Sequence, residues 1–215
     1  ENEKITCDYA KNLTEYESCG LCVMLVENNE KLIDGIAGIP DENFIRGNVP
    51  MTKREIRASI ASRMHVSKNE CIYDIGAGTG SVSIELALAD YMGIVYAIEE
   101  NEEACALIKE NSDKFGTDNI QIVNGRAQEK LNELPAPDSV FIGGSKGMLK
   151  DIIDQLIRKN PSVHIVMTAV TMETLNEALE YLEINFQKVE TVCIAVTNVV
   201  KRGRYSRASF NVSIV

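Results

Sequence analysis

Tryptophan is missing from the 215 residues of this chain, and histidine is nearly missing, since only His65 and His164 occur. These two histidines have no metal-ligand spacing, and Cys19 and Cys22 form a closely spaced pair without a second pair beside it. The apolar residues after this pair favour two cysteines entering a strand over Leu21–Val26. The sequence therefore predicts no metal site.

A disulfide framework is also missing from the cysteine pattern. The cysteines are scattered through apolar runs, which favours reduced, buried thiols of a cytosolic protein. The six are Cys7, Cys19, Cys22, Cys71, Cys105 and Cys193.

Long hydrophobic runs are the next absence. No run approaches the roughly 18 apolar residues that a membrane-spanning helix needs, and no basic, hydrophobic leader is present. We therefore expect a cytoplasmic protein that does not enter a membrane. Because the first residue is Glu1 rather than Met, we also expect the chain to be part of a longer product.

An excess of basic residues is missing as well. The formal net charge is −10 at pH 7, whereas nucleic-acid-binding surfaces are normally basic, so we expect no nucleic-acid partner. The basic residues form two groups, which are Arg46, Lys53, Arg54 and Arg57, and Lys201, Arg202, Arg204 and Arg207. Such groups are usually solvated faces, but on an acidic protein they also suit a small polyanionic substrate.

The most informative segment present is Tyr73-Asp74-Ile75-Gly76-Ala77-Gly78-Thr79-Gly80. The residues around its start predict a buried strand, and Val82, Ile84 and Leu86 after it predict a helix with an apolar face. Glycines at such a turn let the backbone approach a ligand. Glu99 ends the next apolar run, where a carboxylate accepts hydrogen bonds from ribose hydroxyls. These features predict a nucleoside-containing cofactor.

The spacing of the glycines indicates which cofactor binds. A dinucleotide fingerprint needs a third glycine where Ser81 stands, which disfavours a nicotinamide oxidoreductase. G-x-G-x-G after an acidic residue is instead the pattern of class I S-adenosylmethionine (SAM)-dependent methyltransferases. Asp74 is then expected near the ammonium of the methionine tail, and the loop amides near its carboxylate. The loop residues predicted to bind SAM are Gly76, Ala77, Gly78, Thr79 and Gly80.

Strand and helix patterns alternate from residue 70 onward, which predicts an α/β fold with a parallel sheet covered by helices. We expect strands at about 70–75, 94–98, 120–124, 138–143 and 162–168, and helices at about 81–90, 101–115, 127–133, 147–159 and 171–184. Two further strands, 189–197 and 208–215, predict a terminal hairpin joined by the basic loop 201–204. The expected fold is the Rossmann-like class I methyltransferase fold, with a mostly parallel seven-stranded sheet and an antiparallel C-terminal hairpin.

Glycines and prolines between positions 35 and 50 predict a lead-in loop ahead of the alternating pattern. Thr52 is then expected to open a helix with a capping box, because Glu55 follows three residues later. Ile56, Ile60 and Met64 recur on one face of this helix, so we expect that face to pack on the core.

Two more loops are expected beside the glycine loop, because the carboxyl ends of parallel strands build the site in such folds. Gly125-Arg126-Ala127 follows the third strand, where such enzymes usually place the adenine. Gly143-Gly144-Ser145 follows the fourth, where methyltransferases of amino groups commonly carry an Asn/Asp-Pro-Pro-Tyr-like motif. Its absence argues against an N-methyltransferase, and the two glycines leave open space for a large flat substrate.

Several segments resemble one family in particular. They are Gly38–Ile45, Pro50–Arg57, Asp74–Glu85, Tyr96–Glu99, Phe141–Ser145 and Ala169–Thr174. They are similar to the decarboxylating methyltransferases of cobalamin biosynthesis, the carbon-15 half of the precorrin-6Y C(5,15)-methyltransferases, and the resemblance covers residues 35–200. It implies methylation of carbon 15 of an anionic tetrapyrrole, precorrin-6B or its cobalt form, with loss of carbon dioxide from the ring C acetate.

The resemblance also implies an organisation of the chain. Residues 1–34 look like the tail of a preceding carbon-5 methyltransferase module or a linker, and residues 35–215 are the expected SAM-dependent methyltransferase domain. Known members are often tetrameric. The expected partners are therefore further copies of the chain and a fused or associated carbon-5 methyltransferase module.

Carried over by motif, the resemblance implies cofactor contacts at Thr52, the glycine loop, Glu99 and Ala127, the last through its backbone amide. The chain has Arg126-Ala127-Gln128-Glu129 where family members tend to have Ala-Pro-Glu, which places an arginine beside the adenine pocket. The carboxylates of the substrate need cationic partners. The substrate-binding candidates are Arg57, Gly143, Gly144, Ser145, Lys146, Arg202 and Arg204.

Two alternative functions fit the same cofactor motif. One is a SAM-dependent methyltransferase for RNA or another small metabolite, although the acidic charge disfavours RNA. The other is a SAM-binding partner domain without catalytic activity, which the intact loop and Glu99 disfavour. No Ser/His/Asp or Cys/His constellation is found, so catalysis is expected to rest on alignment of the reactants rather than on a covalent intermediate.

Overall fold

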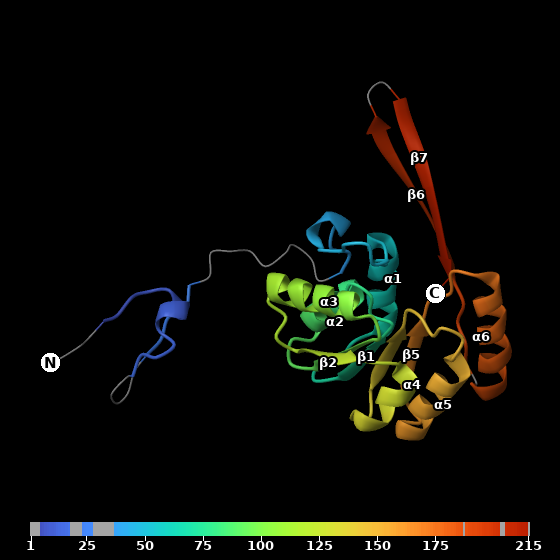
Figure 1. Cartoon of the computed structure of the whole chain (residues 1–215), viewed down its shortest axis with the longest axis horizontal. Helices are drawn as coiled ribbons and strands as arrows, with labels where there is room; N and C mark the ends of the chain where they lie inside the picture. The colour runs from blue at the N-terminus through green and yellow to red at the C-terminus, as the bar shows by residue number, and fades with distance from the viewer. Residues whose placement is uncertain (1–4, 18–22, 28–36, 187, 203–204, 215) are drawn as a thin grey trace. The chain divides into compact units, whose positions relative to one another are not determined.

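A computed structural model describes residues 5–17, 23–27, 37–186, 188–202 and 205–214 of the chain (Figure 1). The chain divides into two compact units, Glu1–Asp34 and Gly35–Val215. Side chains are described as far as residue 199 in the second unit. The second unit contains the glycine loop and every strand found among the described residues, so it is the unit that bears on function.

Five parallel strands form the central sheet of this unit, in the order β3-β2-β1-β4-β5 (Figure 1). Their bounds are β1 Cys71–Ile75, β2 Ile94–Glu99, β3 Ile120–Asn124, β4 Ser139–Ile142 and β5 His164–Met167. The five predicted strands are confirmed to within two residues at each end. The strand order reverses between β1 and β4, and ligands bind at such a switch point in open parallel sheets.

Helices alternate with these strands as predicted. Their bounds are α1 Arg54–Met64, α2 Ser81–Ala89, α3 Glu102–Phe115, α4 Ala127–Lys130, α5 Leu149–Lys159 and α6 Met172–Asn185. The helix expected at 127–133 is divided into α4 and a 3₁₀ turn, η3 Leu131–Glu133. Two further 3₁₀ turns, η1 Ala10–Asn12 and η2 Asp41–Asn43, lie outside the alternating pattern.

The alternation of side chains along β1 divides the core into two layers. Ile72 packs on one face of the sheet, with Ile60 of α1 and Leu86 of α2. Tyr73 packs on the other face, in a cluster that includes Ile152 of α5. Helices therefore cover both faces of the sheet, and the loops at the strand ends are left to form the site.

The capping box predicted at Thr52 is wrong. Helix α1 begins at Arg54, its N-cap is Lys53, and this cap makes no side-chain hydrogen bond within the described part of the chain. The backbone carbonyl of Thr52 accepts a hydrogen bond from the side chain of Arg57, five residues further along the chain. The prediction for the apolar face is confirmed, because Ile56 and Met64 are buried.

The seven-stranded sheet is also corrected. Strands β6 Cys193–Arg202 and β7 Tyr205–Ile214 pair antiparallel, as predicted, but they form a separate two-stranded sheet. Ile194 and Val196 pack against the core, whereas Val199 is 65 % exposed. The two strands pair over ten residues each, from Cys193 with Ile214 to Arg202 with Tyr205.

Two expectations about the cysteines and the first unit also change. Cys7 and Cys193 are exposed rather than buried, whereas Cys71 and Cys105 are partly buried, and all four are free thiols. Cys19 and Cys22 lie outside the described residues. In the predicted strand 21–26, residues 23–26 form no strand and are exposed, and the first two residues lie outside the described ones.

No helix among the described residues is long and apolar enough to cross a membrane.

Candidate active site

A cavity of about 970 Å³ opens at the carboxyl ends of the parallel strands. Its walls come from the loops after β1, β2, β3 and β4, from residues 168 and 170 after β5, and from residues 49–53 before α1. Because every parallel strand ends at this edge of the sheet, segments far apart in sequence meet around one space.

The glycine loop lies against the loop that follows β4. Gly76 has a φ of +74°, and a Cβ atom there would lie 2.9 Å from both the backbone nitrogen and oxygen of Gly144. Gly78 has a φ of +56°, and a Cβ atom there would lie 3.1 Å from the carbonyl oxygen of Pro50. Glycine is therefore required at both positions, because of the left-handed backbone and because a side chain would collide. The backbone of the glycine loop lies close to the backbone of Gly144 and of Pro50.

Glu99 is held at the end of β2 by backbone donors on both sides. Its Oε2 accepts a hydrogen bond from the amide of Gly78 at 2.9 Å, and its Oε1 accepts one from the amide of Asn101 at 2.9 Å. Each carboxylate oxygen retains acceptor capacity beyond that one bond. The side chain lines the cavity, so a pair of adjacent hydroxyls on a ligand can be bound there.

Asp74 lies behind the glycine loop rather than in the cavity. The side chain is fully buried, its Oδ2 accepts a hydrogen bond from Ser83, and its Oδ1 has no partner among the described residues. Burial raises the pKa of Asp74 to about 7, against the opposing effect of the Ser83 hydrogen bond, and the nearby charge of Glu99 raises it further. The structure therefore makes Asp74 a support of the loop.

The last two residues of the predicted loop face the interior as well. The hydroxyl of Thr79 is buried without a hydrogen-bond partner within the described ranges. Gly80 is the N-cap of α2 with a φ of +75°, and a Cβ atom there would lie 3.0 Å from Ile108. Neither residue lines the cavity, so both shape the turn from inside.

A cluster of three charges bridges the loops at the cavity. Glu100 forms ion pairs with Lys146 and with Arg126, the latter at 3.3 Å between Nε and Oε2. The Lys146 hydrogen bond, with the charges of Lys146 and Arg126, lowers the pKa of Glu100. Lys146 and Arg126 are 73 % and 63 % exposed, so ligands have access to both cations.

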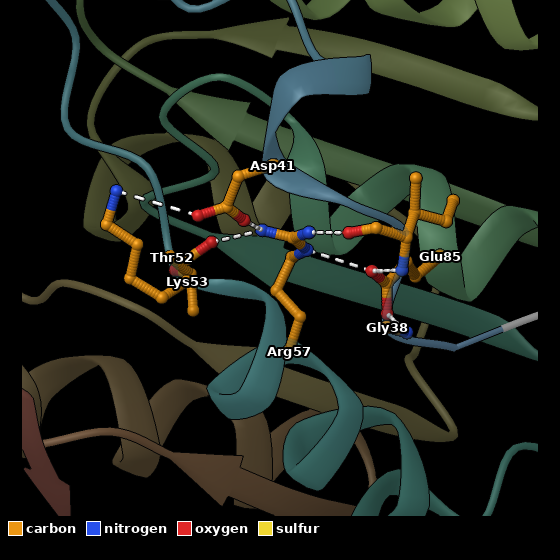
Figure 2. A network of polar contacts seen from close by, with 7 residues as sticks. Gly38, Asp41, Thr52, Lys53, Arg57 and Glu85 are labelled. Atoms are coloured by element: carbon orange, nitrogen blue, oxygen red, sulfur yellow. Dashed lines mark hydrogen bonds and ion pairs between the residues drawn. The ribbon is translucent and has the colours of Figure 1, made fainter. Parts of the chain in front are cut away.

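Arg57 is not a substrate contact, which corrects the prediction made for it. Its side chain is completely buried, and Figure 2 shows its guanidinium enclosed by protein partners. Nε donates to Glu85 at 2.8 Å and Nη1 donates to Asp41 at 2.8 Å. The carbonyl oxygens of Ile39 and Thr52 accept its remaining hydrogen bonds. All of this bonding serves to attach the lead-in segment to α1 and α2.

Twelve predicted residues do meet in the cavity. They are Thr52, Gly76, Ala77, Gly78, Glu99, Gly125, Arg126, Ala127, Gly143, Gly144, Ser145 and Lys146. Of the two remaining candidates, Arg202 lies in β6 with its side chain undescribed, and Arg204 lies outside the described residues. Among the described residues, no group of three or more histidine, cysteine, aspartate or glutamate side chains is arranged to hold a metal ion.

Sequence reasoning missed the wall formed by residues 49–53. Val49, Pro50, Met51 and Lys53 line the cavity beside Thr52. The motif Pro50–Arg57 could have indicated this wall, because it lies before the first strand and resembles the same family as the other motifs. The motif did not indicate that Lys53 lines the cavity whereas the side chain of Arg57 is buried in the core.

A parallel α/β sheet with a glycine turn after β1 and a carboxylate at the end of β2 defines the class I SAM-dependent methyltransferase fold. The family of precorrin methyltransferase domains matches residues 43–209, and the chain belongs to this family.

Individual relatives cover most of the chain. A probable cobalt-precorrin-6B C(15)-methyltransferase (decarboxylating) from Pyrobaculum calidifontis is 41 % identical over 172 residues, which are 79 % of this chain and 88 % of the relative. The crystal structure of precorrin-6Y C5,15-methyltransferase from Geobacter metallireducens has a TM-score of 0.77 and 38 % identity, covering 83 % of this chain and 94 % of that one. A C-terminal domain of precorrin-6Y C5,15-methyltransferase from Rhodobacter capsulatus has a TM-score of 0.73 and 28 % identity, covering 84 % and 97 %.

Proposed function

We propose that this methyltransferase methylates carbon 15 of precorrin-6B or its cobalt form with SAM, and that the ring C acetate is decarboxylated. The observation that carries the proposal is that the glycine loop, Glu99 and the open loop Gly143–Ser145 line the same cavity. The Pyrobaculum calidifontis relative is named for this methylation and decarboxylation, which supports the same reaction here.

The residues around the glycine loop suit SAM. Glu99 has acceptor capacity for ribose hydroxyls, and Gly76 and Gly78 bring backbone to the cavity wall without side chains. Ala127 begins α4 at the cavity, where its backbone amide is available to the adenine. Thr52 lies on the wall formed by residues 49–53. Bound SAM would supply a methyl group already activated by its sulfonium.

The charge of the cavity suits an anionic tetrapyrrole. Its charged lining residues are three cations and two carboxylates, although the whole chain has a net charge of −10. The cations are Lys53, Arg126 and Lys146, and the carboxylates are Glu99 and Glu100. A Cβ atom built on Gly144 would meet nothing within 4 Å, so open space lies beside this loop for a large ring.

The protein's contribution to the reaction is positioning. The macrocycle is itself the nucleophile, so the chain has to hold the two reactants in line rather than supply a base. Ile56, Ile75, Ile98 and Met148 contribute apolar surface to the wall of the cavity. The cationic side chains would hold the carboxylates of the ring, and a dry wall beside the ring C acetate would favour loss of carbon dioxide.

The first test is calorimetric titration with SAM and S-adenosylhomocysteine, with NAD as the negative ligand. We expect binding of the first two by the wild-type chain, and a loss of at least about tenfold in Glu99→Ala, because charge-assisted hydrogen bonds to the ribose are removed. Glu102→Ala is the matched control, since Glu102 is exposed and does not line the cavity. Binding of NAD in preference to SAM would contradict the proposal.

Turnover is the second test. Incubation with SAM and the tetrapyrrole should give a product that has gained one methyl group and lost one carbon dioxide, which mass spectrometry detects. Binding of SAM without turnover would favour a non-catalytic partner domain. Methylation without loss of carbon dioxide would contradict the decarboxylating activity.

We also propose that unit Glu1–Asp34 is the tail of a preceding carbon-5 methyltransferase module and that the chain is a homo-oligomer. The Rhodobacter capsulatus structure is of a C-terminal domain, which supports a preceding module. Native mass spectrometry of the 23.8-kDa chain would give the oligomeric state directly, and a monomer at micromolar concentration would contradict the second part.

A further inference from the structure

Lys53 is a cation of the cavity wall. It is the N-cap of α1, it lines the cavity beside Thr52, and its side chain is 43 % exposed. Its Nζ lies 3.6 Å from Oδ2 of Asp41 (Figure 2). This distance is long for a hydrogen-bonded pair, so Lys53 retains capacity for another anion.

Asp41 is fixed from the opposite side. Its Oδ1 accepts a hydrogen bond from Arg57 at 2.8 Å, so its two carboxylate oxygens face two different cations. Arg57 is in turn bound to Glu85, which also accepts hydrogen bonds from the amides of Gly38 and Ile39 at 2.9 and 3.0 Å. Glu85, Arg57, Asp41 and Lys53 therefore form a line of alternating charge from the core to the cavity.

The inner half of this line cannot change partners easily. Arg57 and Glu85 have almost no exposed surface, and the guanidinium of Arg57 lies 4.6 Å from the ring centroid of Phe44. Separating a buried ion pair leaves an uncompensated charge in the core. Asp41 is therefore held in place by Arg57. The partly exposed side chain of Lys53 can change the position of its ammonium group.

The other cations of the cavity are in a different situation. Arg126 and Lys146 share Glu100, which lies on the loop after β2. Asp41 contacts both Arg57 and Lys53. Its distance to Arg57 Nη1 is 2.8 Å, shorter than the 3.6 Å to Lys53 Nζ. Of the three cations that line the cavity, Lys53 thus has the weakest contact with a carboxylate in the part of the chain that the structure describes.

We propose that Lys53 binds a carboxylate of the ligand in this cavity, and that Asp41, fixed by Arg57, positions it. The inference rests on the proposed function, which brings two carboxylate-bearing molecules to the cavity. One is SAM, through its methionine carboxylate, and the other is the tetrapyrrole, through its side chains. The chemistry is the same for both, and ligands that lack one carboxylate distinguish them.

The test compares Lys53→Met with Lys53→Arg and with Arg54→Met. Arg54 is the matched control, because it is adjacent and exposed but does not line the cavity. We measure the affinity for S-adenosylhomocysteine, the affinity for 5′-methylthioadenosine, which has no carboxylate, and the KM for the tetrapyrrole. Lys53→Met should weaken one of the carboxylate ligands about tenfold, and Lys53→Arg should stay within about threefold of the wild type.

The outcomes separate the two sources. A loss for S-adenosylhomocysteine without a loss for 5′-methylthioadenosine assigns the methionine carboxylate to Lys53. A raised KM for the tetrapyrrole, with unchanged affinity for S-adenosylhomocysteine, assigns a carboxylate of the tetrapyrrole to Lys53. The proposal is overturned if neither changes, if both adenosine ligands weaken equally, or if Arg54→Met has the same effect. Failure of the proposed function is distinguishable, because the wild-type chain would then show neither binding nor turnover.

The positioning role of Asp41 is tested by a double-mutant cycle. Asp41→Asn should change the affinity for the carboxylate ligand several-fold when Lys53 is present, and should have no effect in the Lys53→Met background. Equal losses in both backgrounds would overturn the positioning role. Because the readout is the coupling between the two variants, a general loss of stability does not imitate it.

Discussion

Two groups of ion pairs in the same unit differ in burial and, we infer, in purpose. Arg57 and Glu85 are fully buried, and the hydrogen bonds of both also serve the backbone of the lead-in segment. Glu100, Lys146 and Arg126 are partly or largely exposed at the cavity. The buried ion pair of Arg57 and Glu85 thus fixes the lead-in segment on the helices. The charges of Glu100, Lys146 and Arg126 can exchange partners, because water competes for this exposed group only.

The largest expected effect breaks the buried group. Glu85→Ala should lower the free energy of unfolding by about 3–5 kcal/mol, since it leaves the Arg57 charge buried without its partner. Urea denaturation measures this, and Glu100→Ala is the matched variant in the exposed group, with an expected midpoint close to that of the wild type. Similar losses in both variants would remove the difference between the two groups.

Asp74 gives a second effect, on the pH dependence of stability. Its pKa is raised from 3.8 to about 7, so the folded chain binds the proton more tightly than the unfolded chain. This contribution is fully present below pH 4 and is lost as the pH rises toward 7, with a slope of at most about 1.4 kcal/mol per pH unit. Asp74→Asn should abolish this slope in unfolding experiments between pH 4 and 7, and an unchanged slope would contradict the assignment.

Gly76→Ala tests the contact between the loops after β1 and β4. The left-handed φ of +74° alone should cost about 1–2 kcal/mol, and the displaced Gly144 backbone should also weaken cofactor binding. Gly116→Ala is the control, since Gly116 has a φ of +65° with no atom within 4 Å of its added Cβ. Calorimetry with S-adenosylhomocysteine should show a loss for Gly76→Ala only.

The smallest expected effect sharpens the exposed group. Glu100→Gln frees Lys146 and Arg126 for an anionic ligand, so the KM for the tetrapyrrole should fall about twofold to threefold at low salt. The difference should shrink as ionic strength rises. Glu102→Gln removes the same charge outside the cavity, and an equal effect from it would show that only the overall charge matters.

The predicted site residues that the structure brings to the cavity are those whose position has a local cause. Glycines at 76 and 78 follow an apolar strand, and Glu99 ends the next one, so spacing alone places them at one sheet edge. The capping box predicted at Thr52 is wrong, because α1 begins at Arg54 and its N-cap is Lys53. Arg57 is held in the core by Glu85, which is 28 residues further along the chain.

Arg57 and Lys53 show most clearly what the sequence does not predict. Both are basic residues in one motif, and the sequence offers no reason to place one in the core and the other on the cavity wall. The direction of a side chain on α1 follows from the way the helix packs on α2 and on the lead-in segment. Charge alone therefore predicted a substrate contact at Arg57, whose side chain is buried.

The sequence by itself determined the order of strands and helices, the glycine turn, the carboxylate after β2 and the family, because each depends on neighbouring residues and their periodicity. The tertiary structure decided that Asp74 and Arg57 are buried, that Lys53 lines the cavity, and that the hairpin forms a sheet of its own. These features depend on contacts between distant segments, and the pattern of a single segment does not contain them.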